Sequence, residues 1–215
     1  ATGNSQTKNG SLLGDFVARG EQLRLTLNGR YVYSHQDGEP SAKNTRALIK
    51  MDFFITKRFF WFAASYFEKD EFQDLNLRTA LSSGPGYSFI EKGDFESPWL
   101  KDMTLYAEAG PAYFNEDFKN DKDQKSARAR LAVRLNWPIL EDRVTFYHSQ
   151  EFYPESTKNY YLTMDNGVRF KLFAGFVSNI QMTTRYNSEP TTDTEKTDNL
   201  YLLTLGYNFD TTRKR

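Results

Sequence analysis

The sequence contains no cysteine in 215 residues, so disulfide bridges and thiolate metal sites are excluded. It contains only two histidines, His35 and His148, which lie far apart in the chain. Without cysteines they do not have the ligand spacing of a zinc site. We therefore expect neither a metal ion nor a cofactor.

An excess of charge of one sign is also absent, because Lys plus Arg and Asp plus Glu both number 28. This balance gives no reason to expect nucleic acid or a strongly anionic partner. No apolar run approaches the roughly 18 residues of a transmembrane helix, whereas a transmembrane β-barrel is not excluded, because alternation dilutes its apolar signal. No repeat or linker divides the chain, which predicts a single domain over residues 1–215.

Aromatic residues are abundant, at 16% of the sequence, and they occur in alternating patterns. In residues 75–89 apolar side chains alternate with small or polar ones over the whole segment. A soluble strand has about five or six residues. A transmembrane strand needs about ten, with aromatic residues where it meets the membrane interface. This segment therefore predicts a strand that crosses a bilayer.

Similar alternation recurs along the chain, and we predict an all-β, antiparallel transmembrane barrel of about 12 strands. Pro85 and Pro111 fall inside strand patterns, where we expect bulges because proline cannot donate to the ladder. Residues 91–102 are polar and leave room for a helix of one or two turns. About eleven strands are visible, near residues 5–18, 22–34, 44–55, 59–67, 75–89, 103–113, 127–137, 144–152, 162–170, 180–186 and 201–209.

Single-chain bacterial barrels have an even number of strands, so we predict a further strand upstream of Ala1. Without it, the strand at 5–18 would present an unpaired edge unless the precursor or a partner chain supplies the missing strand. Short turns at 19–21, 56–58, 138–142 and 172–174 would face the periplasm. Longer loops would face outside, and only 91–102 departs from this rule.

Several motifs carry a family resemblance: EKDEF, QDLNLRT and GPGY within residues 67–86, TGNS at 2–5, RYNSEP at 185–190, KTD at 196–198 and YNF at 207–209. Together they resemble the salt-induced outer-membrane protein family, also called YdiY-like. The resemblance spans nearly the whole chain. It implies a β-barrel in the bacterial outer membrane, but no reaction, because that family has no established activity.

The polar strand faces are predicted to line a lumen. Three arginines share one face of 127–137, and each would cost roughly 2 to 4 kcal/mol near the lipid midplane. Cations outnumber anions on these faces. Either a salt-bridge network fills a small lumen, or a constriction favours anions. The lumen-lining candidates are Arg24, Arg30, Arg46, Lys50, Asp52, Arg78, Glu108, Arg128, Arg130, Arg134, Asp165, Arg169, Lys171 and Arg185.

The outward faces end in aromatic residues, which predicts two girdles in contact with outer-membrane lipid. We assign one rim to Tyr31, Tyr33, Tyr66, Tyr113 and Tyr186, and the other to Tyr87, Trp137, Tyr207 and Phe209.

A catalytic site is not predicted. His148 and Ser149 invite comparison with outer-membrane phospholipases, but adjacent strand residues point to opposite faces and cannot share a proton. The acidic segment 115–123 lacks the glycine and terminal glutamate of a calcium loop, and we interpret it as a solvated loop.

The function predicted from these features is a small, anion-leaning pore or passive conduit in the bacterial outer membrane. The alternative is a structural or anchoring component with a plugged lumen, either of the outer membrane itself or of a larger envelope complex that includes a partner chain. An outer-membrane hydrolase is a more distant third. A soluble, lipocalin-like barrel is the alternative fold, and it would place the apolar face inward.

Overall fold

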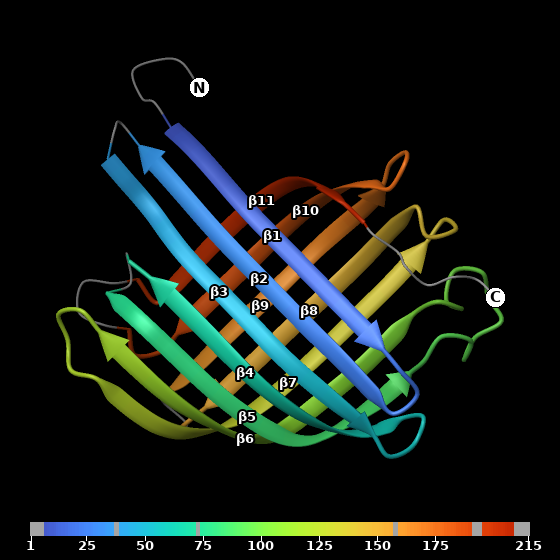
Figure 1. The fold of residues 1–215 in the computed structure, drawn as a ribbon, viewed down its shortest axis with the longest axis horizontal. Coiled ribbons are helices and arrows are strands. Elements are labelled where there is room, and N and C mark those ends of the chain that lie inside the picture. The colour runs from blue at the N-terminus through green and yellow to red at the C-terminus, as the bar shows by residue number, and fades with distance from the viewer. Residues whose placement is uncertain (1–6, 37–38, 72–73, 157–158, 191–194, 209–215) are drawn as a thin grey trace.

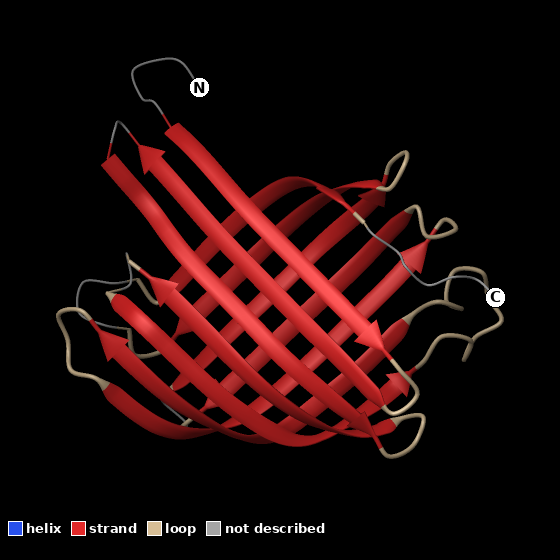
Figure 2. Ribbon diagram, in the orientation of Figure 1, coloured by secondary structure: helices blue, strands red, loops and turns tan. Residues whose placement is uncertain are grey.

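All the regular structure in the computed structural model is β-strand, as Figure 2 shows, and the residues described are 7–36, 39–71, 74–156, 159–190 and 195–208. The strands are β1 (Thr7–Arg19), β2 (Leu23–Gln36), β3 (Glu39–Phe54), β4 (Phe59–Asp70), β5 (Leu75–Ile90), β6 (Thr104–Phe118), β7 (Gln124–Ile139), β8 (Val144–Pro154), β9 (Tyr160–Lys171), β10 (Phe176–Asn187) and β11 (Thr197–Tyr207).

The eleven strands form one antiparallel sheet in which each strand pairs with its neighbours in the chain, in the order β1 to β11. The sheet curls so that β8 to β11 lie behind β1 to β4 in Figure 1, which makes a nearly closed barrel. No ladder joins β1 to β11 among the described residues. The predicted all-β antiparallel barrel is confirmed. The strand predicted upstream of Ala1 lies outside the described residues and stays a prediction.

The two ends of the barrel are distinguished here by their connections. The turn end carries 20–22, 55–58, 91–103, 140–143 and 172–175, at the right of Figure 1, and the loop end carries the other connections. Residues 91–103 contain turns and no helix, with the Leu100 and Lys101 backbone N–H groups both donating to the Ser97 carbonyl.

At the loop end the strands continue beyond the positions predicted from alternation. The strand predicted to end at 67 continues to Asp70 in β4, and the strand predicted to end at 113 continues to Phe118 in β6. The ladder extends there because Arg46 faces Glu68 and Arg78 faces Glu116 in register, so opposite charges lie directly across the strands.

The bulges predicted at Pro85 and Pro111 are wrong. The β5–β6 register is the same at Ser82, opposite Ala112, as at Gly86, opposite Glu108. The irregularities lie instead between Leu75 and Leu77 and between Ser88 and Ile90. Pro85 remains in register with Trp61 of β4, and Pro111 remains in register with Ala129 of β7. The missing proline N–H groups therefore interrupt pairing only between β5 and β6.

The wall is apolar outside and charged inside. Two neighbouring residues of β7 illustrate this: Leu131 on the outer face is 47% exposed, whereas Arg130 on the inner face is 1% exposed. A lipocalin-like barrel would show the reverse, so the alternative fold does not fit. The outward apolar face includes Leu27, Ile49, Met51, Phe53, Trp61, Leu81, Leu131, Val133, Ile180, Leu203 and Leu205.

Among the described residues there is no helix long and apolar enough to cross a membrane.

Candidate functional site: the barrel interior

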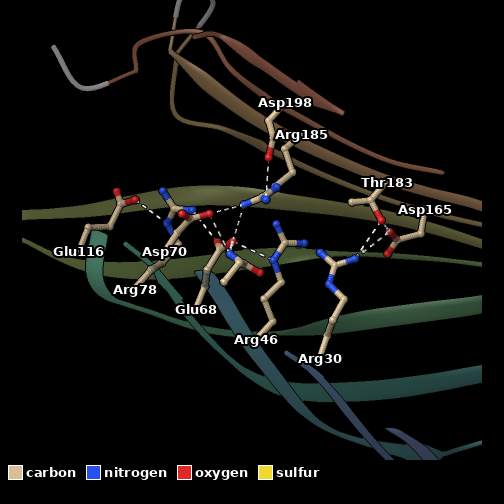
Figure 3. Close-up of polar contacts among 11 residues, drawn as sticks. Arg30, Arg46, Glu68, Asp70, Arg78, Glu116, Asp165, Thr183, Arg185 and Asp198 are labelled. Carbon is tan, nitrogen blue, oxygen red and sulfur yellow. Dashed lines mark hydrogen bonds and ion pairs between the residues drawn. The ribbon is translucent and has the colours of Figure 1, made fainter. Parts of the chain in front are cut away.

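The first ion-pair network of the interior lies toward the loop end and centres on Glu68 of β4, a fully buried carboxylate (Figure 3). It accepts from Arg46 Nε at 2.8 Å, Arg78 Nη1 at 2.8 Å and Arg185 Nη1 at 3.1 Å. Arg185 stands on β10 and also pairs with Asp70 at 3.0 Å. Since β10 and β4 are not sheet neighbours, these pairs cross the interior and join opposite walls.

A second network lies toward the turn end and centres on Glu108 of β6. Glu108 pairs with Lys50 and accepts from Arg130 Nη1 at 2.8 Å. Lys50 also pairs with Asp52 at 2.6 Å, and Asp52 accepts from Arg24 Nε at 2.6 Å. The network therefore ties β2 and β3 to β6 and β7 through ion pairs, of which Arg24–Asp52 and Arg130–Glu108 are also charge-assisted hydrogen bonds.

Aromatic rings pack beside the charged groups of both networks. Phe114, Tyr153 and Tyr161 form one buried cluster, and Phe60 and Phe62 belong to another. Guanidinium groups lie over these rings, with Arg130 4.8 Å from the centroid of Phe62 and Arg78 4.8 Å from that of Tyr161. The rings thus stabilise the same cations that the carboxylates pair with.

Uncharged polar groups gather in another part of the interior, at Tyr147 of β8 and at Asn179, Gln181 and Thr183 of β10, beside Asp165 of β9. The Tyr147 hydroxyl donates to Asn179 Oδ1 at 2.9 Å, and Gln181 Nε2 donates to Asp165 Oδ1 at 3.0 Å. Thr183 Oγ1 accepts from Arg30 Nη1 at 2.9 Å, which links β10 to β2. Amides and hydroxyls can both donate and accept, so these uncharged groups can exchange hydrogen-bond partners.

The sequence matches one protein-family model over nearly its whole length. The model described as "Protein of unknown function, DUF481" matches residues 1–209. The chain belongs to this family. No curated protein matches the sequence.

A solved structure described as "NanC porin structure in rhombohedral crystal form" resembles this DUF481 barrel with a TM-score of 0.54. The alignment covers 93% of this chain and 99% of that chain, at 6% sequence identity. At this identity the likeness shows the fold alone, which is a porin-like barrel.

The predicted lumen-lining residues lie in three environments. Eight are buried in the interior: Arg30, Arg46, Lys50, Asp52, Arg78, Glu108, Arg130 and Arg185. Arg24, Arg128 and Arg134 are partly buried and contact the same networks, whereas the partly buried Asp165 lies near Arg30 and accepts from Gln181 and Thr183. At the turn end, Arg169 lies 5.6 Å from the Tyr147 ring centroid, and the exposed Lys171 pairs with Asp142 at 3.6 Å, so neither joins the networks.

Sequence reasoning missed four interior carboxylates, which lowers the predicted excess of inward cations. Glu116 pairs with Arg78 at 2.6 Å and Arg128 at 2.9 Å, and Glu151 pairs with Arg130 at 3.1 Å. Continued alternation was an available signal for Glu116 alone, which shares a face of β6 with the predicted lumen residue Glu108. No predicted lumen residue lies on β4 or β8, so the other three had no such signal. The four are Glu68, Asp70, Glu116 and Glu151.

Of the predicted girdle aromatics, Tyr66 is the one that the structure contradicts. It packs against the buried Phe114–Tyr161 cluster on the inner face, because β4 places Phe60 and Phe62 inside and Tyr66 shares their parity. Phe209 lies outside the described residues. Tyr31, Tyr87, Tyr113 and Tyr207 are exposed, Tyr33 is half-buried, Tyr186 stacks on Tyr160, and Trp137 contacts Phe146.

His148 and Ser149 sit in a regular stretch of the β8–β9 ladder, opposite Asn166 and Asp165. His148 Nδ1 lies 2.7 Å from Asn166 Oδ1, so its partner is an amide across the ladder. Since successive strand residues point to opposite faces, the geometry gives the two no shared proton. The described residues contain no group of three or more His, Cys, Asp or Glu side chains that could hold a metal ion.

Proposed function

We propose that this chain is a bacterial outer-membrane barrel that acts as a narrow passive conduit for small anions. The observation that carries the proposal is a charged interior inside a wall whose outer face is apolar. Strands of this kind suit a bilayer, where lipid-facing and lumen-facing residues alternate. The porin-like fold and the resemblance to salt-induced outer-membrane proteins support the location.

The conduit is narrow because two contacts join opposite walls. Arg185 reaches Glu68 from β10, and Arg30 reaches Thr183 from β2. A cavity of about 30 Å³ lies at the loop end between Arg78 and Arg185. Roughly 10–15 Å³ is enough for one water molecule, so this cavity has room for only a few atoms. We therefore expect a small unit conductance.

The second candidate function is an anchoring barrel with a filled lumen, held beside a partner chain. The same cross-lumen ion pairs favour it, and so do the two sheet edges. Leu12 on β1 and Leu203 on β11 are 73% and 76% exposed, against 47% for Leu131 inside the sheet. Unpaired strand edges are costly in lipid, so an additional strand or a partner chain would fill the gap between β1 and β11 in this proposal.

Single-channel recording in planar bilayers tests these two functions. We expect a small conductance for the refolded protein, with a reversal potential in a KCl gradient that leans toward chloride. Arg185→Gln breaks a cross-lumen link and removes a cation, so its conductance should rise and its reversal potential should shift toward potassium. Lys171→Gln, at the turn-end rim, is the matched control and should change neither. No conductance in any of the three proteins would overturn the conduit and favour the anchoring barrel.

A further inference from the structure

Two buried arginines of the interior have N–H groups without hydrogen-bond partners. Arg30 and Arg46 are 7% and 8% exposed. Within the part of the chain that the structure describes, Arg30 Nε and Nη2 and Arg46 Nη2 are buried and lack a protein acceptor. Leaving a buried donor unsatisfied costs about 1–3 kcal/mol, and more when the group is charged. These donors therefore require an acceptor that the neighbouring side chains do not supply.

The two arginines lie directly opposite each other on β2 and β3. Such cross-strand partners have Cβ atoms about 4.5–5.5 Å apart on the same face of the sheet, and like charges in this arrangement repel. Figure 3 shows the two guanidinium groups side by side, both pointing into the interior. The pair therefore concentrates positive charge and free donors in one place.

The nearby carboxylates are occupied by other groups. Glu68 accepts from Arg46 through Nε alone, and it also serves Arg78 and Arg185. Asp165 lies 3.8 Å from Arg30, beyond hydrogen-bond range, while it accepts from Thr183 at 2.5 Å. Neither carboxylate satisfies the free donors of Arg30.

Arg185 supplies a third positive group beside this pair. It enters from β10, as Figure 3 shows, and its Nε is also buried without a partner. The Nη atoms of Arg185 pair with Glu68, Asp70 and Asp198, so its Nε–H group is the donor that remains available. Donors from β2, β3 and β10 thus surround one part of the lumen.

We propose that Arg30 and Arg46 form a binding site for a small oxyanion of the phosphate or sulfate class, with Arg185 Nε as an additional donor. A planar guanidinium offers paired N–H groups whose geometry matches two oxygens of one oxyanion. Two such groups side by side supply the donors and the positive charge that the oxyanion needs. The inference deepens the proposed function, on which it rests for access to the lumen, because the bound anion would occupy the conduit.

Isothermal titration calorimetry of the refolded full chain in detergent micelles tests the site, with inorganic phosphate and sulfate as probes at constant ionic strength. We expect saturable binding with one site per chain. Arg30→Gln should weaken it by about tenfold or more, because a lost charge-assisted hydrogen bond has roughly that effect. This variant removes the 3.8 Å ion pair of Asp165, but Asp165 keeps its hydrogen bonds from Gln181 and Thr183. Arg128→Gln is the matched control, because the Arg128 Nε and Nη2 groups already donate to Ser126 and Glu116, and its binding should be unchanged.

Arg30→Lys keeps the positive charge but loses the paired donors, so it covers the case in which Arg30→Gln does not fold. Its binding should also weaken, while its heat-modifiable gel mobility stays that of the folded protein. Absence of saturable phosphate and sulfate binding, equal affinity for chloride, or unchanged binding in a folded Arg30 variant would each overturn the site. The calorimetric measurement of binding does not depend on conduction across a membrane. A protein that conducts but does not bind phosphate or sulfate would therefore refute the site alone. Binding without conductance refutes the conduit alone.

Discussion

The interior differs between two regions of one continuous sheet. From β3 to β8 the inner face carries buried carboxylates and cations such as Glu68, Glu108 and Arg130, packed with aromatic rings. On β10 the inner face carries Asn179, Gln181 and Thr183, with amide and hydroxyl contacts, and only Arg185, nearer the loop end, joins the charged network. Paired charges hold a fixed geometry because breaking one pair leaves a buried charge, whereas amides and hydroxyls exchange partners. The charged region is therefore the frame, and the uncharged region is where we place the path of a solute.

The largest expected effect comes from Glu68→Gln in the charged region. It leaves three arginines without their shared carboxylate, and removal of one partner from a buried pair costs about 3–5 kcal/mol. Its counterpart is Gln181→Ala in the uncharged region, where the hydrogen bonds to Asp165 and Thr183 are lost at about 1 kcal/mol each. Urea unfolding in detergent, followed by tryptophan fluorescence, gives both free energies. If the two variants lost equal free energies of unfolding, the charged and the uncharged regions would contribute equally to the stability of the barrel.

The inward and outward faces of the frame strands can be predicted from sequence alone. In β7 the alternation of Leu131 and Val133 with Arg130 and Arg134 leaves one arrangement in a bilayer, because charge on the lipid side is too costly. That argument needs no partner strand, so it held for the wall as a whole.

Interior partners are harder to predict, because they depend on contacts distant in sequence. Glu68 and Arg185 are separated by 117 positions. Glu68 and Asp70 stand in a charged stretch that is also typical of a loop, and only pairing with Arg46 shows that the strand continues. Tyr66 was misassigned for a related reason, since residues 59–67 are apolar on both faces and alternation alone does not orient them.

A second, intermediate effect is expected where strands of the frame approach closely. A Cβ atom at Gly110 of β6 would lie 2.1 Å from the Ser83 carbonyl oxygen, whereas one at Gly29 of β2 would meet nothing within 4 Å. Gly110→Ala must push backbone atoms apart, at a cost of about 1–3 kcal/mol. Gly29→Ala should be neutral or stabilise by up to about 1 kcal/mol, because alanine restricts the unfolded chain. The same urea titration measures both, and a tolerated Gly110→Ala would show that β5 and β6 can separate at little cost.

The smallest effect is expected for Asp94→Asn at the turn end. An arginine–carboxylate pair occurs there as it does in the frame, but at an exposed position. Both Asp94 carboxylate oxygens accept from Arg58 Nη2 at 2.8 Å, and Oδ2 also accepts from the Glu91 backbone N–H at 2.9 Å. That backbone hydrogen bond, and then the Arg58 charge, lower the pKa of Asp94 below its usual value. Water screens such a pair, so it contributes little compared with the Glu68 network.

The lowered pKa of Asp94 sets the pH dependence of this small effect. A carboxyl group whose pKa is lower in the folded state contributes stability above its unfolded pKa of about 3.9, and it loses that contribution as the pH falls through the folded value. Wild type should therefore be slightly more stable than Asp94→Asn at pH 7, and the two unfolding free energies should converge in the acid range. A difference that stays constant down to acid pH would assign the effect to something other than the carboxylate charge. A loss as large as that of Glu68→Gln would mean that burial does not distinguish the frame from the rim.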